Sequence, residues 1–494
     1  MLRKIRTILA AVFFILITLL FLDFTGTLHH WLSWLSKIQF LPAVMALNVI
    51  VVVALIVLTL VFGRIYCSVI CPLGVFQDVL ARFHRKKNKY EYSKEMKWLR
   101  YPVLVVFVLA AVTGIGSLFQ LLAPYSSYGR IATMIFQPIW KAGNNLLAMV
   151  AEHMESYAFY SVDTWLRSLP VLVIAAVTLV VLFILAWRGG RTYCNTICPV
   201  GTILSFFARF SWLKIKFDVD KCKNCSLCSK NCKAACIDYK THTVDYSRCV
   251  VCGNCIDSCK FGALKYSSVI SHSGDSSNSG DSSNIDTSKR SFLLATTLVA
   301  TGAMAQKKEK LMDGGLAEIE DKVAPERQTP LTPPGSLSFQ NLSTRCTGCQ
   351  LCVSECPNQV LRPSSDLMHL MQPTMSYEHG YCRPECTRCS EVCPAGAIKP
   401  VDKPEKTTIQ IGHAVWIKKN CVVLTDEVEC GNCARHCPSG AIEMVPLDAD
   451  NEESPMVPAI NEAACIGCGA CEYVCPSRPF SAIYVEGHEV HKKI

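Results

Sequence analysis

Long apolar runs separated by polar loops dominate the first two hundred residues of the chain. Four such runs lie roughly at residues 8–22, 40–62, 101–122 and 169–187. The last three approach or exceed the ~20 residues with which a helix crosses an apolar bilayer core of ~30 Å. The first run is shorter and follows three basic residues, but no small-residue cleavage site follows it, so we expect an uncleaved anchor rather than a signal peptide. The pattern predicts an α-helical membrane bundle of four helices.

The distribution of basic residues predicts the orientation of this bundle. The N-terminus and the loop over 82–100 are rich in Lys and Arg, whereas the loops over 23–39 and 123–168 hold very few. Because basic loops remain in the cytoplasm, the second and fourth helices are expected to run inward. Beside apolar runs, such a basic loop indicates a membrane-flanking segment and not a nucleic-acid partner.

One short sequence is written twice, each time directly after an apolar run. The stretches "GRIYCSVICPLGVFQDVLARF" (63–83) and "GRTYCNTICPVGTILSFFARF" (190–210) are identical at 11 of 21 positions. A parallel internal repeat of this kind predicts that the two motifs lie close together at the cytoplasmic face, with the two thiols of each motif sharing a helix face if the helix continues. The motifs contribute four thiols: Cys67, Cys71, Cys194 and Cys198.

The chemistry of these four thiols is left open by the sequence. Together they could hold a metal ion or an iron–sulfur cluster, or they could act as two dithiols. The alternative is that they are small buried apolar side chains. Repetition within one chain favours a shared chemical role.

After residue 214 the chain becomes polar, and cysteines recur with the spacing of a bacterial ferredoxin that holds two [4Fe–4S] clusters. In such ferredoxins three closely spaced cysteines hold one cluster, and the fourth cysteine of the motif reaches the neighbouring cluster. We therefore assign one cluster to Cys222, Cys225, Cys228 and Cys259, and the other to Cys249, Cys252, Cys255 and Cys232. Cys236 is an extra cysteine, which we interpret as a spare thiol rather than as an alternative ligand to Cys232. The region is expected to have an α+β ferredoxin-like fold.

A Ser/Gly/Asp/Asn-rich stretch at 267–288 predicts a flexible linker. The segment 289–306 that follows is similar to a twin-arginine export signal, with Lys289 and Arg290 in place of the arginine pair and a cleavage-like Ala-Met-Ala at its end. The alternative is a short hydrophobic helix packed on the ferredoxin. The signal interpretation predicts that the remainder of the chain lies outside the cytoplasm.

Four further cysteine motifs occupy the region 307–494 and predict four more [4Fe–4S] clusters. Their ligands are Cys346, Cys349, Cys352, Cys356, Cys382, Cys386, Cys389, Cys393, Cys421, Cys430, Cys433, Cys437, Cys465, Cys468, Cys471 and Cys475. Whether neighbouring motifs pair or the pairs are nested is left open. Six clusters, Cys236 and the four repeated thiols account for all 29 cysteines.

The order of these motifs resembles two known families joined in one chain. Residues 1–265 resemble the NapH-type membrane ferredoxins, and residues 288–494 resemble the NapG/MauM-type polyferredoxins, most clearly in "CRPECTRCSEVCPAGAIKP" (382–400) and "ACIGCGACEYVCP" (464–476). The resemblance implies a quinol dehydrogenase module of a bacterial inner membrane, which takes electrons from the quinone pool and passes them to a periplasmic reductase or cytochrome. The predicted domains are 1–213, 214–266 and 307–494, with the linker and the signal between the last two.

The sequence also supports a second class of function. NapH-like architectures are found in proteins that assemble oxidases or handle copper, in which the four repeated thiols would bind or reduce copper, because thiolates suit Cu(I). Six clusters in one chain favour an electron carrier over a metal chaperone, and also over a scaffold whose clusters only stabilise the fold.

No motif identifies a catalytic residue. The chain has no Walker A sequence, no Rossmann fingerprint, no nucleophile elbow and no C-x-x-C-H haem motif, so the terminal chemistry is expected in a partner. Several polar residues lie near the predicted membrane edges, where we expect headgroup or loop positions rather than quinone ligands: His29, His30, Asp78, Arg64 and Arg191.

Overall fold

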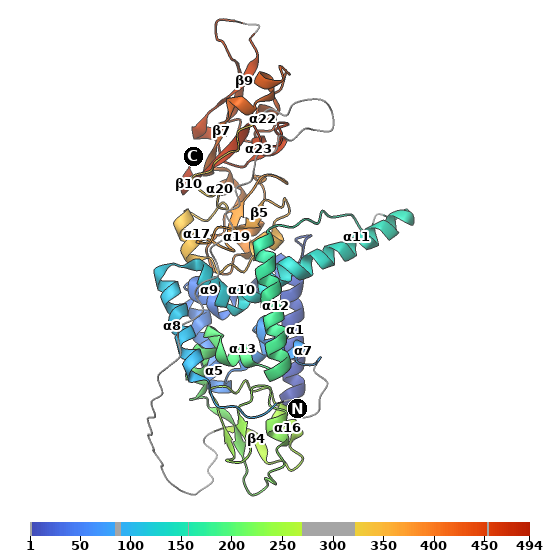
Figure 1. The fold of residues 1–494 in the computed structure, drawn as a ribbon, viewed down its shortest axis with the longest axis vertical. Helices are drawn as coiled ribbons and strands as arrows, with labels where there is room; N and C mark the ends of the chain where they lie inside the picture. The colour runs from blue at the N-terminus through green and yellow to red at the C-terminus, as the bar shows by residue number, and fades with distance from the viewer. Residues whose placement is uncertain (1, 84–89, 157, 269–321, 452–453) are drawn as a thin grey trace, which may run out of the picture.

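The computed structural model describes residues 2–83, 90–156, 158–268, 322–451 and 454–494. The molecule is elongated, with a small ferredoxin-like region at one end, a helical region in the middle and the C-terminal cysteine-rich region at the other end (Figure 1). The predicted linker and signal at 267–306 lie outside the described residues, apart from the end of the last ferredoxin strand.

Four apolar helices form the frame of the helical region: α1 (Leu2–Leu22), α5 (Val49–Phe62), α8 (Lys97–Thr113) and α12 (Leu169–Gly189). Within the described residues, α1 and α12 are long and apolar enough to cross a membrane. The outward faces of all four helices expose apolar side chains, such as Val12, Val57, Val108 and Val177. A complete four-helix membrane bundle therefore stays a prediction.

The second and third apolar runs are not continuous helices, which corrects the sequence-based expectation. The second run is divided into α4 (Phe40–Met45) and α5, and Asn48 caps the start of α5 through its side-chain oxygen. The third run is divided into α8 and α9 (Gly116–Leu122) at Gly114, whose φ of 76° lies in the left-handed region that ends helices. Both breaks contain helix-terminating residues, which are hard to recognise in the sequence because the residues around them are apolar.

The repeated Cys-x-x-x-Cys-Pro stretches also interrupt the helices. Each forms a short helix, a tight bend and a second helix, in the order α6 (Ile65–Val69) and α7 (Pro72–Leu80), then α13 (Thr192–Thr196) and α14 (Pro199–Ala208). Cys71 and Cys198 have extended backbones and precede proline at the first helical position. Because the residue before proline avoids the helical conformation, the helix does not continue through the motif. The two thiols of a motif therefore do not share one helix face.

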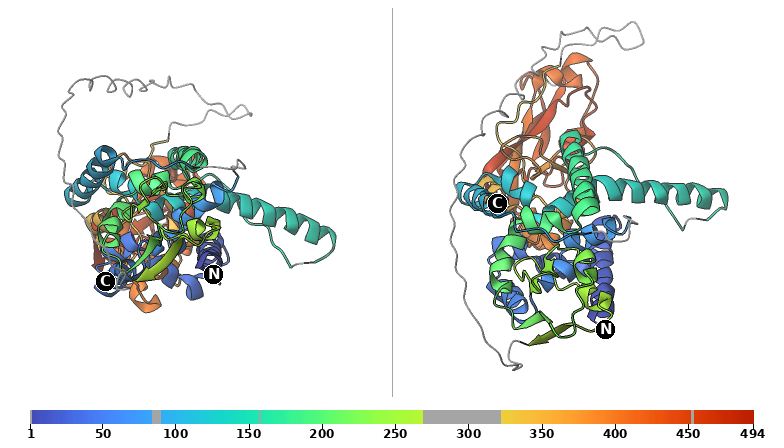
Figure 2. Two further views of the ribbon diagram at one scale, coloured as in Figure 1. Left: turned by 90° about the horizontal axis from the view of Figure 1, so that it is seen from below. Right: turned by 60° about the horizontal axis from the view of Figure 1, so that its bottom comes forward.

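Short helices close the upper end of the helical region: α2 (His29–Leu32), α3 (Trp34–Lys37), α10 (Pro124–Ile131) and a π-helix, η1 (Ala132–Phe136). From η1 the chain continues into α11 (Gln137–His153), which projects sideways from the body, across the direction of α1 and α12 (Figures 1 and 2). The face of α11 away from the returning loop is mostly apolar and exposed.

The ferredoxin-like region has two antiparallel strand pairs and two short helices. Strand β1 (Leu213–Phe217) pairs with β4 (Leu264–Ser268), and β2 (Ile237–Asp238) pairs with β3 (Thr243–Val244). Helices α15 (Leu227–Lys230) and α16 (Asn254–Ser258) each follow the first two cysteines of a motif. The region therefore contains two similar halves.

The C-terminal region consists of two modules. The first contains α17 (Phe339–Arg345), α18 (Leu351–Glu355), β5 (Leu361–Pro363), β6 (Pro373–Met375), α19 (Arg388–Val392) and α20 (Lys403–Thr407). The second contains β7 (Ile409–Trp416), η2 (Lys418–Asn420), α21 (Val422–Thr425), α22 (Asn432–Arg435), β8 (Ile442–Pro446), β9 (Met456–Ile460), η3 (Glu462–Ala464), α23 (Ala470–Val474) and β10 (Ile483–Lys493). Strand β10 pairs antiparallel with β7, and its last residues return to the first module.

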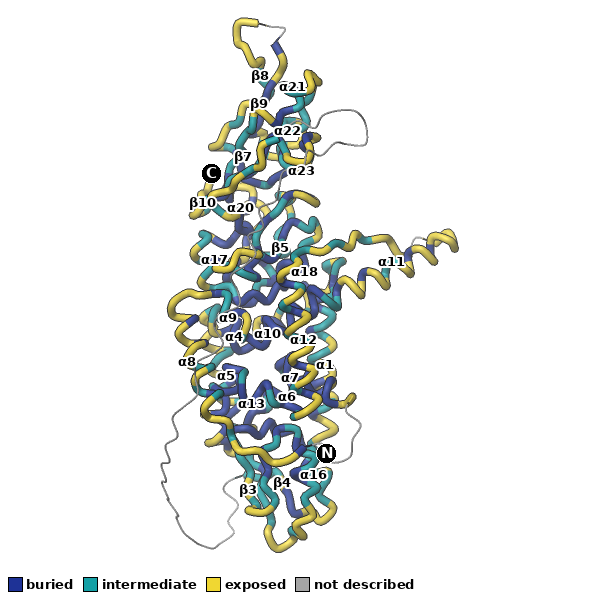
Figure 3. Tube along the Cα trace, viewed as in Figure 1, coloured by how far each residue is buried: buried dark blue, intermediate teal, exposed yellow. Residues whose placement is uncertain are grey.

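One apolar core runs through most of the molecule. It includes residues of the ferredoxin-like region, the helical region and the first C-terminal module, whereas the second module has a core of its own. Buried segments continue along the long axis of the chain (Figure 3). Four arginines are among the largest fully buried side chains: Arg64, Arg100, Arg130 and Arg191.

Candidate electron-transfer centres

The four repeated thiols meet at one place in the helical region. Cys67, Cys71, Cys194 and Cys198 are each 4–5% exposed. Burial raises the pKa of Cys71 and Cys198, and the neighbouring thiols of both motifs raise it further. Since each motif is an electrostatic neighbour of the other, the four residues form one group, which we call the central thiol centre.

An arginine from each motif donates a hydrogen bond to the other motif across this centre. Arg191 donates a hydrogen bond from Nη1 to the backbone oxygen of Cys67 at 2.6 Å, and Arg64 donates from Nη2 to the backbone oxygen of Cys194 at 3.2 Å. Nη2 of Arg64 also lies 3.9 Å from the sulfur of Cys67. Two positive charges beside four thiols suit a centre that carries negative charge when it is metallated.

Two glycines allow the motifs to close on themselves. A Cβ atom on Gly74 would lie 2.2 Å from the backbone oxygen of Cys67, and a Cβ atom on Gly201 would lie 2.3 Å from that of Cys194. Both glycines occupy the same position of the repeat, so in each motif the backbone approaches the first cysteine equally closely. No other residue type fits there without a shift of the backbone.

A buried charge network around Asp78 adjoins the centre. Asp78 accepts hydrogen bonds from Arg191 at 2.9 and 3.0 Å and from Arg6 at 3.0 Å, and Nζ of Lys233 lies 3.4 Å away. Burial would raise the pKa of Asp78, but Arg191, Lys233 and Arg6 outweigh it and hold this pKa well below its usual range. The equivalent position of the second repeat is Ser205, so the charge network breaks the symmetry.

These charged residues correct one expectation from the sequence. Arg64, Asp78 and Arg191 do not lie in headgroup or loop positions, because they are buried around the central thiol centre. His29 is also buried, while His30 is exposed. The Gly-Arg pair that recurs at 63–64 and 190–191 is the sequence feature that could have indicated the buried positions of the two arginines.

The cysteines of the ferredoxin-like region form two groups. Set 1 consists of Cys222, Cys225, Cys228 and Cys259, which line one hollow. Set 2 consists of Cys249, Cys252, Cys255 and Cys232, in which Cys255 has the other three as electrostatic neighbours. Cys236 is 1% exposed, with its sulfur 3.5 Å from that of Cys232 and hydrogen-bonded to Cys249. The extra thiol therefore lies within set 2 and not apart from it.

Adjacent motifs share their cysteines in the C-terminal region, which answers the question that spacing left open. Set 3 is Cys346, Cys349, Cys352 and Cys393, and set 4 is Cys382, Cys386, Cys389 and Cys356, as their electrostatic neighbours show. Set 5 is Cys421, Cys430, Cys433 and Cys475, and set 6 is Cys465, Cys468, Cys471 and Cys437. Each module of the region thus holds two sets.

The environment of the sulfurs fits iron–sulfur clusters. Backbone N–H groups donate to the sulfurs of Cys259, Cys346, Cys393, Cys437 and Cys475 at 3.3–3.4 Å. Such bonds stabilise the thiolate form that ligates iron. In set 4, Lys406 adds a buried cation that also donates to the backbone oxygens of Arg383 and Cys386.

Set 2 is fastened directly to the central thiol centre. Arg64 donates from Nη1 to the backbone oxygen of Ser247 at 2.9 Å, two residues before Cys249. The backbone N–H of Arg191 donates to the oxygen of Lys233, next to Cys232, at 2.9 Å. One arginine from each repeat thus contacts a cysteine loop of set 2.

Set 3 is fastened to the opposite side of the helical region. A Cβ atom on Gly129 of α10 would lie 2.2 Å from the backbone oxygen of Cys349, so helix and cysteine loop are in direct contact. Gln120 donates from Nε2 to the oxygen of Cys346 at 3.1 Å. Tyr193, the neighbour of Cys194, donates to the oxygen of Leu122 at the end of α9. Helices α9 and α10 therefore contact both the surroundings of the central thiol centre and set 3.

Hydrogen bonds at the cysteine loops help to join the two C-terminal modules. The backbone N–H of Cys382 donates to the oxygen of Cys468 at 2.9 Å, and the hydroxyl of Tyr377 donates to the oxygen of Gly467 at 2.6 Å. Set 4 is thus adjacent to set 6, not to set 5. Along the molecule the groups follow the order 1, 2, central, 3, 4, 6 and 5.

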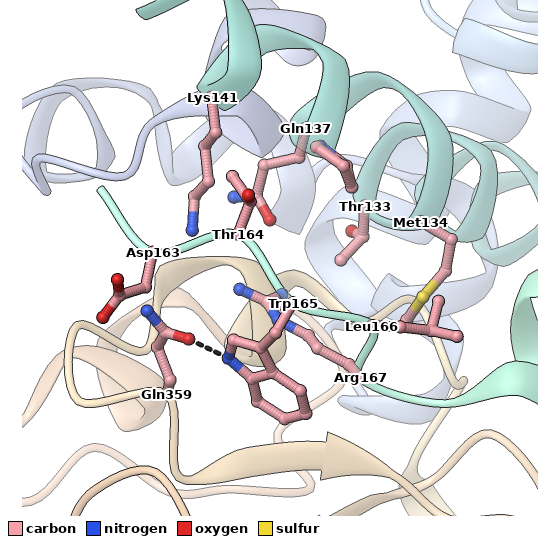
Figure 4. A pocket seen from close by; sticks show the side chains of 11 residues that line it. Thr133, Met134, Gln137, Lys141, Asp163, Thr164, Trp165, Leu166, Arg167 and Gln359 are labelled. Atoms are coloured by element: carbon pink, nitrogen blue, oxygen red, sulfur yellow. Dashed lines mark hydrogen bonds between the residues drawn. The ribbon is translucent and has the colours of Figure 1, made fainter. Parts of the chain in front are cut away.

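A hollow at the root of α11 is lined by polar side chains from Lys141, Asp163 and Arg167 (Figure 4). The ring of Trp165 lies across its floor and its Nε1 donates to Oε1 of Gln359. Burial lowers the pKa of Arg167 to about 10, while Cys356 and Cys352 raise it. This hollow lies beside sets 3 and 4.

Comparison with known proteins agrees with this arrangement. Family profiles described as "4Fe-4S binding domain" match residues 44–90 and 169–219, and also 242–265, and one described as "4Fe-4S dicluster domain" matches 345–397 and 428–478. The first profile spans both repeated motifs, and the last spans the two C-terminal modules. No solved structure matches the chain.

Three curated relatives illustrate the similarity. The methylamine utilization ferredoxin-type protein MauM of Paracoccus denitrificans is 30% identical over 165 residues, which cover 32% of this chain and 73% of MauM. The ferredoxin-type protein NapH of Haemophilus influenzae is 26% identical over 223 residues, covering 43% of this chain and 65% of NapH. The ferredoxin-type protein NapG of Escherichia coli is 26% identical over 176 residues, covering 33% of this chain and 75% of NapG. The chain belongs to the ferredoxin-type iron–sulfur electron-transport proteins of the NapH, NapG and MauM kind.

Proposed function

We propose that the protein is a membrane-anchored electron conductor that oxidises quinol and passes the electrons to a redox partner. The observation that carries the proposal is the position of the central thiol centre, which contacts set 2 on one side and is linked to set 3 through α9 and α10 on the other. A bilayer core of ~30 Å is too thick for one electron step between two separate ferredoxin regions. A redox centre inside the helical region would divide that distance.

The six ferredoxin sets would each hold a [4Fe–4S] cluster, and the central thiol centre would hold a seventh. This assignment is supported by four buried thiols, by two flanking arginines and by the iron–sulfur description of the profile that spans both motifs. Quinol would release two electrons, one at a time, and two protons. The terminal reaction belongs to the partner, a reductase or cytochrome.

The proposed topology places four helices across the inner membrane, with the ferredoxin-like region in the cytoplasm and the C-terminal region in the periplasm. The segment 289–306, as an export signal or fifth membrane segment, would carry the chain across the membrane once more. It is supported by the basic loops and by the position of the two regions at opposite ends of the helical region (Figure 1). Protease added to sealed spheroplasts should digest residues 322–494 and spare 214–268. Protection of both regions would contradict this topology.

The function is tested by the variants Cys67→Ala and Cys194→Ala and by their combination. Each single variant should lose about four of about 28 iron atoms and abolish quinol-driven bleaching of the ferredoxin clusters, because removing one ligand of a shared cluster removes the cluster. The double variant should be no worse, since residues that act as a unit are not additive. Dithionite should still bleach the remaining clusters in all three.

The control is Thr113→Ala, which removes an exposed hydroxyl that bonds the backbone of its own helix α8, and it should keep quinol-driven bleaching. Bleaching that survives in both single variants would exclude the central thiol centre from the electron path. The purified wild-type protein could instead contain copper and lack the four iron atoms of the central cluster. That result would favour the alternative function of copper handling, because four buried thiols also suit Cu(I).

A further inference from the structure

A group of metal-binding side chains without sulfur lies where the end of α1 meets the C-terminal region. Asp23 and His29 come from the loop after α1, and Glu355 comes from α18. One ligand atom from each of the three residues can be chosen so that all three lie within 4.8 Å of one another, and all three residues are buried. Both parts of the molecule therefore contribute to one compact donor set.

Glu355 is the unusual member of this group. Its side chain is 0% exposed, and neither carboxylate oxygen has a hydrogen-bond partner among the described residues. Its Oε2 lies 3.9 Å from Nδ1 of His29, which also lacks a hydrogen-bond partner. A buried carboxylate without a hydrogen bond or a cation is costly, so something absent from the polypeptide should compensate it.

Asp23 is held in place as an anion. It accepts hydrogen bonds from the backbone N–H groups of Gly26 at 2.8 Å, Leu28 at 2.7 Å and His29 at 3.2 Å. The guanidinium of Arg388 is an electrostatic neighbour of Glu355, but no Lys or Arg side chain within the described ranges forms an ion pair with Asp23 or Glu355. Two buried carboxyl groups thus face one imidazole.

The orientation of His29 completes the arrangement. Its Nε2 lies 3.2 Å from Oε2 of Glu391 in α19, which leaves Nδ1 directed toward Glu355. A metal-binding histidine commonly donates its second ring N–H to a carboxylate, which fixes the ring and raises its basicity. Glu391 would have this orienting role.

We propose that Asp23, His29 and Glu355 bind a divalent metal ion, with Glu391 orienting His29 from behind. One imidazole and two carboxylates suit Zn²⁺, Fe²⁺ or Mn²⁺ and not the copper or iron–sulfur chemistry of the thiols. Because its ligands come from the loop after α1 and from α18, the ion fastens the helical region to the first C-terminal module. The site is independent of quinol oxidation and of the central thiol centre.

The test uses the full chain in detergent, with its clusters oxidised and loosely bound metal removed by EDTA. Mn²⁺ is titrated in, and the free aqueous ion is counted by its EPR signal. Wild-type protein should bind one Mn²⁺ per chain, with Zn²⁺ displacing it. Glu355→Gln and His29→Asn should abolish this binding, and Glu391→Gln should weaken it by about 10–100-fold.

The matched control is Glu378→Gln, because Glu378 belongs to the same module but has a 68% exposed side chain paired with Arg362. It should bind Mn²⁺ like the wild type. Unchanged cluster absorption in Glu355→Gln shows that the variant is folded. If Fe²⁺ already fills the site, Mn²⁺ does not bind, and the wild type shows a high-spin Fe²⁺ doublet in its Mössbauer spectrum. Glu355→Gln should lack this doublet. Absence of both signals, or Mn²⁺ binding that survives Glu355→Gln, overturns the proposal and leaves a proton as the compensating group.

Discussion

Arg64 and Arg191 occupy the same position in the two repeats, and each donates a hydrogen bond to the backbone of the first cysteine in the other repeat. The two motifs are therefore interlocked, and neither can adopt its conformation without the other. Both arginines also contact the cysteine loops of set 2. The repeat thus positions four thiols and connects them to the ferredoxin-like region at the same time.

The charge network at Asp78 should be a major source of stability. Asp78→Asn would leave Arg6, Arg191 and Lys233 buried without their anion, which costs about 3–5 kcal/mol when one partner of a buried pair is removed. The control Asp257→Asn removes only the exposed pair with Arg3, whose side chain is 52% exposed, and should cost less than about 1 kcal/mol. Thermal loss of cluster absorbance in detergent compares the two. Equal shifts in midpoint would mean that the network contributes no special stability.

Glycine-to-alanine substitutions should have opposite effects at two helical positions. In Gly74→Ala the new Cβ atom would meet the backbone of Cys67, and the forced shift should destabilise the fold by about 1–3 kcal/mol and lower the iron content of the central thiol centre. In Gly143→Ala, within α11, nothing lies within 4 Å of the new atom. That substitution should stabilise by about 0.5–1 kcal/mol, since alanine is the better helix former. A stable, fully metallated Gly74→Ala protein would contradict the close approach.

The sharing of cysteines between adjacent motifs predicts a pattern of iron loss. Cys421→Ala and Cys475→Ala should each lose about four iron atoms, and so should their combination, because both residues belong to set 5. Combining Cys437→Ala with Cys475→Ala should lose about eight, since those residues belong to different sets. Iron analysis of the reconstituted proteins distinguishes the two results. Nested pairing of the motifs would give a different pattern.

The C-terminal strand should detach at acid pH. Burial lowers the pKa of His491 from 6.5 to about 4, with a smaller contribution from His488, and Nε2 of His491 lies 2.8 Å from Oγ1 of Thr332. Because the folded-state pKa is below the unfolded value, the associated stability is present above pH 6.5 and is lost as the pH falls toward 4. The shift corresponds to about 3 kcal/mol at most.

Proteolysis of β10 as a function of pH tests this behaviour. In the wild type, cleavage near the C-terminus should increase between pH 6.5 and pH 4. His491→Gln keeps a polar side chain but cannot take up the proton, so its cleavage should vary much less with pH. An identical pH profile in both proteins would assign the effect to another group.

Local spacing carried much of the information about the sites. In four of the six ferredoxin motifs, three cysteines lie within seven residues and can wrap a cluster only as neighbours, so the sequence predicted which thiols belong together there. The repeat at 63–83 and 190–210 predicted that two distant pairs of thiols would meet. The choice between adjacent and nested pairing depends on contacts across the whole C-terminal region, such as Cys382 with Cys468, which no local pattern encodes.

The roles of the charged residues could not be predicted in the same way. A charged residue at the end of an apolar run has two favourable destinations, the lipid headgroups or a buried ion pair, and the sequence alone does not contain the position of its partner. Arg191 is fully buried because Asp78 lies opposite it, 113 positions earlier in the chain. Similarly, the helix breaks at Asn48 and Gly114 lie within strongly apolar surroundings, where hydropathy dominates the pattern.

The path of β10 has a consequence for how a partner is reached. The strand begins in the outer module and returns along β7, so that His491 donates its backbone N–H to Leu337 of the inner module. The outermost cysteine group, set 5, is therefore built from residues 421–475, while the last residue folds back toward the helices. A protein fused to Ile494 would be delivered to the flank of the array and not to its tip. Gene fusions that aim to capture the outgoing electrons should instead enter next to β8 and β9, which lie toward the far end of the molecule (Figure 1).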